Sequence, residues 1–104
     1  MNRLVALCSS NPARIFGLYP QKGDIRVGAD ADIIIWNPDY HSIISAETHH
    51  QNCNINIYWG VPVKGNADRV IAGGRVIIEN GVMTEQAANG KYIFRTTGGQ
   101  PVKI

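Results

Sequence analysis

The sequence predicts a mainly β chain with a short helical segment at its N-terminus, an α+β arrangement within one small domain. Three observations predict it: a proline-marked apolar stretch before residue 20, a β-branched run at 33–36, and paired β-branched runs around Gly73-Gly74. The 104 residues are 44% hydrophobic and 17% charged. This composition is typical of a globular chain and excludes a disordered one.

Residues 4–18 predict two helices. Residues 4–8 place Leu and Val on one apolar stripe, and Ser9-Ser10-Asn11-Pro12 is a cap followed by a proline in the first turn. The second helix is expected over residues 12–18, with Ile15, Phe16 and Leu18 facing inward.

Residues 22–38 predict a tight antiparallel pair of strands. Ile25 and Val27 alternate with polar residues, and Gly28-Ala29-Asp30-Ala31 is a turn signal. The apolar run 33–36 suits a strand that is covered on both faces. Asn37-Pro38 is expected to end this strand, because proline supplies no ladder donor.

The second half of the chain predicts short strands and turns. Ile43-Ile44 suggests a separate short strand, and residues 45–56 are expected to form an extended loop. Residues 61–65 are expected to form an edge strand, since proline is tolerated at an edge. Residues 69–79 form the clearest hairpin, with Gly73-Gly74 as a two-residue turn. Further turns are expected at Asn80-Gly81 and Asn89-Gly90, and residues 95–104 read as a tail.

The charge pattern excludes several classes of partner. A formal charge of +2 is spread thinly, which argues against nucleic acid and against a polybasic membrane contact. No apolar run approaches the length of a membrane span, and residues 4–8 are too short for the core of a signal peptide. Cys8 and Cys53 could pair, but without a signal segment we expect two free thiols and a cytoplasmic location.

Two groups of residues are candidates for metal or acid–base chemistry. His49 and His50 are adjacent, so in an extended segment they point to opposite faces, and His41 is isolated. The favoured interpretation is that both imidazoles are hydrogen-bonded structural groups. Asp30 and Asp32 flank an alanine at a strand entry, where carboxylates more often bond to turn backbone than perform catalysis.

The remaining candidates have structural explanations. Ser9-Ser10 and Cys8 lack a base at a recognisable spacing, and helix capping accounts for the serines. Gly73-Gly74 lacks the following helix that a phosphate loop requires. The sequence therefore predicts no catalytic, cofactor-binding or metal-binding residue in this chain.

Several blocks of the sequence resemble one enzyme family. Asn11-Pro12-Ala13-Arg14-Ile15-Phe16-Gly17-Leu18, Lys22-Gly23-Asp24-Ile25 and Val27-Gly28-Ala29-Asp30-Ala31-Asp32-Ile33 resemble the C-terminal signature of the amidohydrolase superfamily. Ser45-Ala46-Glu47-Thr48-His49-His50-Gln51 and Asn56-Ile57-Tyr58-Trp59-Gly60 resemble its dihydropyrimidinase and hydantoinase branch. The resemblance runs from about residue 2 to 93 and covers about the last fifth of such an enzyme; Trp59 and Ala67 depart from the family pattern.

This resemblance implies a division of the chain into three parts. Residues 1–20 would be the end of the last helix of a (β/α)₈ barrel with its connector. Residues 21–94 would be part of a composite β-sandwich, and residues 95–104 would be a C-terminal tail. The resemblance implies that the partner of this segment is the remainder of the parent enzyme. It also implies that the parent is a homo-oligomer, namely a tetramer.

The resemblance also implies the parent's chemistry. The parent would hydrolyse a cyclic amide with two zinc ions and an aspartate proton shuttle, and all of those groups, including a carboxylated lysine, lie upstream of this chain. Two alternatives stay open. One is the C-terminal part of a non-enzymatic scaffold of the collapsin response mediator type, although His50-Gln51 resembles the enzyme branch more closely. The other is a standalone small β-domain.

Overall fold

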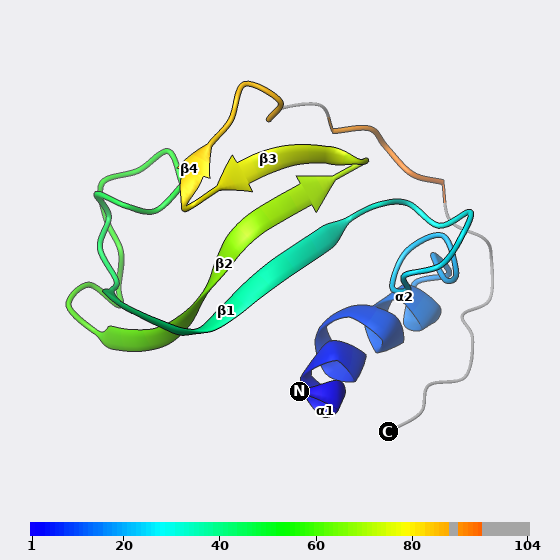
Figure 1. Ribbon diagram of the computed structural model, residues 1–104, viewed down its shortest axis with the longest axis horizontal. Coiled ribbons are helices and arrows are strands. Elements are labelled where there is room, and N and C mark those ends of the chain that lie inside the picture. Colours follow the sequence, from blue (N-terminus) through cyan, green and yellow to red (C-terminus); the bar gives the residue numbers. More distant parts are fainter. Residues whose placement is uncertain (88–89, 95–104) are drawn as a thin grey trace. The chain divides into compact units, whose positions relative to one another are not determined.

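The computed structural model describes residues 1–87 and 90–94 and divides them into two compact units. One unit holds residues 1–32 and the described residues 90–94, and the other holds residues 33–87. The first is helical at its N-terminus, and the second is an antiparallel sheet (Figure 1). The predicted fold class, mainly β with an N-terminal helix, is therefore confirmed. The predicted tail at 95–104 and the turn at Asn89 lie outside the described residues.

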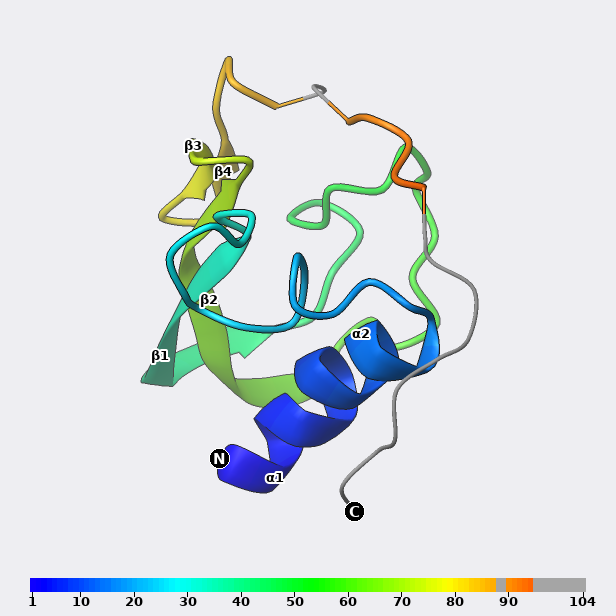
Figure 2. The ribbon, with the colours of Figure 1, turned by 90° about the vertical axis from the view of Figure 1, so that its right-hand side faces the viewer.

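The N-terminal helical run is continuous, which corrects the prediction of two helices separated by a serine cap (Figure 2). It consists of α1 (Asn2–Val5), a π-helical segment η1 (Ala6–Ser10) and α2 (Asn11–Ile15). Ser10 has right-handed helical angles and makes no capping bond. The π-helical segment lies just before Pro12, whose missing N–H and bulky ring disfavour regular α-helical bonding to the preceding turn.

The helix ends at a glycine. Gly17 has a φ of +72°, Leu18 N–H donates to the Ala13 carbonyl (2.8 Å), and Gly17 N–H donates to the Arg14 carbonyl (3.3 Å). These bonds form a Schellman motif. Because the chain turns here, Ile15 and Phe16 remain 53% and 55% exposed, and the prediction that they face inward is wrong.

The loop after the helix packs on α2 without forming a strand. Gly23 lies so close to α2 that a Cβ there would be 2.5 Å from the Ala13 Cβ, and Ala13 is the only buried apolar side chain among the described residues. Ile25 is 80% exposed and Val27 is fully exposed. The predicted strand at 25–27 is therefore wrong, and only the turn at Gly28 (φ +90°) is present. Two alternating apolar residues are too few to specify a strand.

The sheet contains four strands in the order β1 (Ile33–Ile43), β2 (Pro62–Ala72), β3 (Arg75–Glu79) and β4 (Val82–Met83) (Figure 1). All three pairings are antiparallel. The predicted hairpin at 69–79 is confirmed, with Ala72 paired to Arg75 and φ values of +56° and +80° at Gly73 and Gly74. The turn at Asn80-Gly81 is also confirmed, with φ values of +51° and +78°.

Strand β1 corrects the prediction that Asn37-Pro38 ends the strand and that Ile43 belongs to another. Its pairing with β2 is interrupted between Asn37 and His41, which places Pro38 in a bulge where no ladder donor is needed. Asp39 N–H instead donates to the Asn37 side-chain oxygen (3.0 Å). The pairing then resumes and continues to Ile43.

Strand β2 lies between β1 and β3, but β3 pairs only with residues 69–72. Among the described strands the stretch 62–65 therefore has β1 as its one neighbour, and the predicted edge strand at 61–65 is confirmed as the beginning of a longer strand. Proline is tolerated because Pro62 is the first residue of the strand. Gly65 has a φ of +95°, and a Cβ there would be 2.6 Å from Cζ2 of Trp36, so the indole ring lies directly over this glycine.

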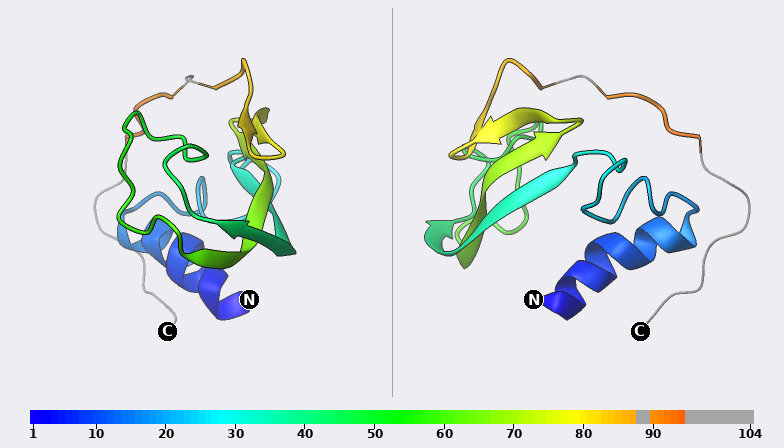
Figure 3. Two further views of the ribbon diagram at one scale, coloured as in Figure 1. Left: turned by 90° about the vertical axis from the view of Figure 1, so that its left-hand side faces the viewer. Right: turned by 45° about the vertical axis from the view of Figure 1, so that its right-hand side comes forward.

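The described residues do not cover the run at 33–36 on both faces. Ile34 is 61% exposed, and Ile35 and Trp36 are about half exposed. A long loop, residues 45–60, leaves the end of β1 and returns to β2 without a helix or strand of its own, as predicted for residues 45–56 (Figure 3).

Candidate functional site

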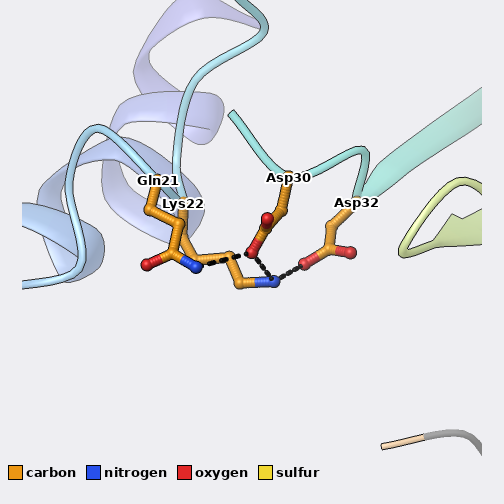
Figure 4. Close-up of polar contacts among 4 residues, drawn as sticks. All are labelled: Gln21, Lys22, Asp30 and Asp32. Atoms are coloured by element: carbon orange, nitrogen blue, oxygen red, sulfur yellow. Dashed lines mark hydrogen bonds and ion pairs between the residues drawn. The ribbon is translucent and has the colours of Figure 1, made fainter. Parts of the chain in front are cut away.

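Asp30 and Asp32 are held by a lysine that the sequence did not single out (Figure 4). Lys22 Nζ lies 2.9 Å from Asp30 Oδ2 and also binds Asp32, and Gln21 Nε2 donates to Asp30 (3.1 Å). Burial lowers the pKa of Lys22, but hydrogen bonds from Lys22 to Asp32 and Asp30 outweigh it, so the net pKa is raised. Both carboxylates thus help to close the loop, through the side chain of Lys22 and not through the turn backbone bonds that were expected of them.

A second polar cluster lies around Tyr19. Arg14 and Arg26 place their guanidinium carbons 4.3 Å and 5.3 Å from the centre of its ring. The Tyr19 hydroxyl donates to Asp24 (3.0 Å) and accepts from Arg26 (2.7 Å). The Tyr19 and Arg26 hydrogen bonds lower the pKa of Asp24. The cluster joins α2 to the loop that follows it: Arg26 forms an ion pair with Asp24, and Arg14 lies over the ring of Tyr19.

Neither cluster follows from a pattern in the sequence. Lys22 precedes Asp30 by eight residues, and Arg14, Tyr19 and Arg26 share no helical or strand spacing. Their contacts depend on the path of an irregular loop, which periodicity does not predict.

The three histidines lie apart from any metal-like grouping. His49 Nε2 is 2.8 Å from the Cys53 carbonyl oxygen, and its Nδ1 is 3.4 Å from Asn56 Nδ2, so the prediction of a hydrogen-bonded structural role is confirmed for His49. His50 is exposed and has no hydrogen bond to another described residue, so the prediction is wrong there. His41 lies in β1 opposite Lys64.

The described residues do not fit a zinc site. Over residues 1–87 and 90–94, no three His, Cys, Asp or Glu side chains come together as metal ligands. Catalytic zinc requires about three protein ligands in convergent geometry. No chemical step can therefore be derived from a metal held by these residues.

The other candidates have ordinary structural positions. Cys8 lies in the π-helical segment and Cys53 in the long loop, and both are free and exposed. Gly73-Gly74 forms the turn of the β2–β3 hairpin. None of the helices in the described part of the chain is long and apolar enough to cross a membrane.

Comparison with known proteins places the chain in a family. Residues 1–77 match the model of the Amidohydrolase family. The dihydropyrimidinase of Rattus norvegicus is 51% identical over 94 residues, which are 90% of this chain and 18% of that protein. Dihydropyrimidinase-related protein 5 of Mus musculus is 44% identical over 91 residues, which are 88% of this chain and 16% of that protein.

The structural comparison agrees. The crystal structure of dihydropyrimidinase from Brevibacillus agri NCHU1002 matches with a TM-score of 0.90 at 38% identity, covering 97% of this chain and 22% of that one. The chain therefore spans about a fifth of the length of these relatives. The resemblance seen in the sequence motifs is confirmed, and the chain belongs to the amidohydrolase family.

Proposed function

We propose that this chain is the C-terminal structural part of a dihydropyrimidinase-like enzyme that hydrolyses cyclic amides, and that it performs no chemical step by itself. The observation that carries the proposal is the 51% identity to a dihydropyrimidinase, sustained over 90% of the chain but only 18% of that enzyme. The clusters around Lys22 and Tyr19 serve loop structure, and the described residues hold no three-ligand metal group.

The surface of the chain supports a scaffold role. Leu4, Val5 and Leu7 on the helical run are more than half exposed, as are Ile34 and Ile43 on β1. On each of the two elements, large apolar side chains that are left exposed are consistent with a surface that another part of a protein covers. In the proposed parent, the helical run would cover a barrel and β1 would meet further strands of a composite sandwich.

The proposal extends to the whole parent. The parent would hold two zinc ions outside this chain. It would be a cytoplasmic homo-oligomer, namely a tetramer. Neither nucleic acid nor a membrane would be among its partners. The division into residues 1–20, 21–94 and 95–104 belongs to the same proposal.

The runner-up is the C-terminal part of a non-enzymatic scaffold of the collapsin response mediator type. The higher identity to the dihydropyrimidinase (51%) than to the dihydropyrimidinase-related protein (44%) favours the enzyme. The reading frame upstream of Met1 separates the two: intact metal-ligand histidines indicate an enzyme, and their loss indicates a scaffold. A stop codon directly upstream would instead favour a standalone β-domain.

A chimera tests the proposal directly. The matching segment of the rat dihydropyrimidinase is replaced by residues of this chain, and hydrolysis of dihydrouracil is measured with the unmodified rat enzyme as reference. The same chimera carrying Gly65→Val is the control, because this change should prevent the β1–β2 pairing. We expect turnover in the first chimera and its loss in the second. A soluble, correctly assembled first chimera without turnover would contradict the enzyme proposal.

A further inference from the structure

The turn between β3 and β4 contains an asparagine followed by a glycine, Asn80-Gly81. Both residues have positive φ, +51° and +78°, and the flanking residues Glu79 and Val82 pair with each other. This is the geometry of a two-residue type I′ turn, which the pair Asn-Gly favours. Asn80 and Gly81 are both exposed to solvent, and β4 is the last strand in the order of the sheet (Figure 1). Water therefore has access to the turn.

Two groups in this turn that can react with each other have no other partner. Among the described residues, the side-chain amide of Asn80 and the N–H of Gly81 form no hydrogen bond. No atom lies within 4 Å of the position that a Cβ on Gly81 would occupy, so the space beside its nitrogen is open. An asparagine side chain can bring its amide carbon to the next backbone nitrogen, and glycine hinders this approach least because it has no Cβ.

We propose that Asn80 is a site of spontaneous modification, at which the chain converts asparagine to isoaspartate. The Gly81 nitrogen loses its proton to hydroxide and attacks Cγ of Asn80. The bond from Cγ to the side-chain nitrogen breaks, and this nitrogen takes a proton from water and leaves as ammonia. Water then opens the succinimide ring. Cleavage at Cγ gives aspartate, and cleavage at the main-chain carbonyl gives isoaspartate, in which the main chain runs through Cγ.

The balance of the reaction needs only water: one water molecule is taken up and one ammonia is lost. Asparagine belongs to the thermolabile residues for this kind of reason. The new carboxylate adds a negative charge next to Glu79, whose own charge is paired with Arg69 at 3.1 Å. This modification is independent of the proposed function.

The turn itself slows the reaction. In a type I′ turn the first central residue has a ψ of about +30°, the mirror image of a type I turn. With this ψ the nitrogen of Gly81 lies opposite the side chain of Asn80, so the ring closes only after the peptide unit between them has rotated. Strand β4 pairs with β3 at only two positions and ends the described sheet, so little pairing opposes this rotation.

The product no longer fits the turn. Hydrogen bonds fix the chain on both sides of it: Asn80 N–H donates to the Asp68 carbonyl (2.8 Å), and Thr84 N–H donates to the Ile77 carbonyl (2.8 Å). Isoaspartate adds a carbon atom to the main chain between these two bonds. A two-residue turn sets the register of its strands, so the longer connection should loosen the pairing of β4 with β3.

Incubation of the folded full chain in mildly alkaline buffer tests the proposal. Asn89, outside the described residues, also precedes a glycine, so every protein carries Asn89→Gln. Peptide mapping by mass spectrometry measures deamidation, and an isoaspartyl methyltransferase detects isoaspartate. We expect product at Asn80 and none at Asn66, which pairs with Asn37 within the sheet and precedes an alanine. Guanidinium chloride should accelerate the reaction at Asn80, because the unfolded chain has no turn that holds the peptide unit.

Two variants make the result specific. Asn80→Gln should lose the methyltransferase signal, since its longer side chain would have to close a larger, less favourable ring. Asn80→Asp carries the charge of the product without the additional main-chain atom. Hydrogen exchange at the Thr84 amide should therefore be faster in the purified isoaspartate form than in the unmodified chain, and should stay unchanged in Asn80→Asp.

Three results would overturn the proposal. The first is an Asn80 that stays unmodified in the folded chain although it reacts in guanidinium chloride. The second is an Asn66 that reacts as fast as Asn80, and the third is a methyltransferase signal that is undiminished in Asn80→Gln. Equal exchange at Thr84 in the isoaspartate form and in the unmodified chain would contradict the loosening of β4.

Discussion

Replacing Gly65 with alanine should destabilise the sheet more than the same change at any open glycine. Gly65 has a φ of +95°, which side-chain-bearing residues rarely adopt, and the new Cβ would lie 2.6 Å from Cζ2 of Trp36. The nearby indole atoms Cε2 and Nε1 would be 3.1 and 3.2 Å away. The ring therefore has to move away from β2, or the β1–β2 pairing has to loosen.

Two separate costs add at this position. The left-handed backbone conformation costs about 1–2 kcal/mol for a residue with a Cβ. Overpacking against the indole ring adds about 1–3 kcal/mol. The free energy of unfolding should thus fall by about 2–5 kcal/mol. Gly74→Ala, at φ +80° with no atom within 4 Å, should show only the first cost.

A double-mutant cycle separates the two costs. Trp36→Ala removes the ring, so Gly65→Ala in that background should cost only about 1–2 kcal/mol, which leaves a coupling energy of about 1–3 kcal/mol. Urea unfolding of the four proteins is followed by far-ultraviolet circular dichroism, because a fluorescence signal would change with the loss of Trp36. An equal cost of Gly65→Ala in both backgrounds would refute the contact between Trp36 and Gly65.

Four further outcomes are expected. Gly74→Val should lower the free energy of unfolding by about 1–2 kcal/mol or more, whereas Gly90→Val, at an open position without positive φ, should leave the melting temperature nearly unchanged. Hydrogen bonds from Tyr19 and Arg26 to the ionised Asp24 lower its pKa, so these bonds should stabilise the folded chain above about pH 4. The stabilisation should disappear as the pH falls further and Asp24 gains a proton. An identical melting profile between pH 7 and 3 in Asp24→Asn would argue against this contribution. The purified chain should bind zinc no better than micromolar and should not hydrolyse dihydrouracil, and stoichiometric zinc after dialysis would contradict this. Its exposed apolar side chains should make it oligomeric or strongly binding to a hydrophobic dye, so that a dye-negative monomer would instead indicate a self-sufficient domain.

The elements that the sequence predicted correctly are those specified by local chemistry. The two glycines at 73–74 and the pair Asn80-Gly81 require positive φ, and β-branched residues flank the first turn on both sides. Register within such a hairpin follows from the turn itself, so no distant part of the chain is needed to predict it.

The errors arose where distant residues decide the structure. Ile33 pairs with Ile71 and not with the nearby residues 25–27, and sequence periodicity contains no information on this choice of partner. Pro38 appeared to end the strand because the bulge that accommodates it depends on the approach of β2. At the candidate sites, the carboxylates were predicted to be structural, but their partner Lys22 was not identified, because an ion pair across a loop leaves no spacing pattern.

The separation of paired residues along the chain has a consequence for the order of folding. Ala72 and Arg75 pair across three positions, whereas Ile43 and Pro62 pair across nineteen and Ile33 and Ile71 across thirty-eight. Joining distant residues costs chain entropy before any contact compensates for it, so we expect the β2–β3 hairpin to form first and β1 to join it later. Since doubling the length of a flexible loop adds only about 0.6 kcal/mol to the closure cost, insertions into residues 45–60 would slow the arrival of β1 without preventing it.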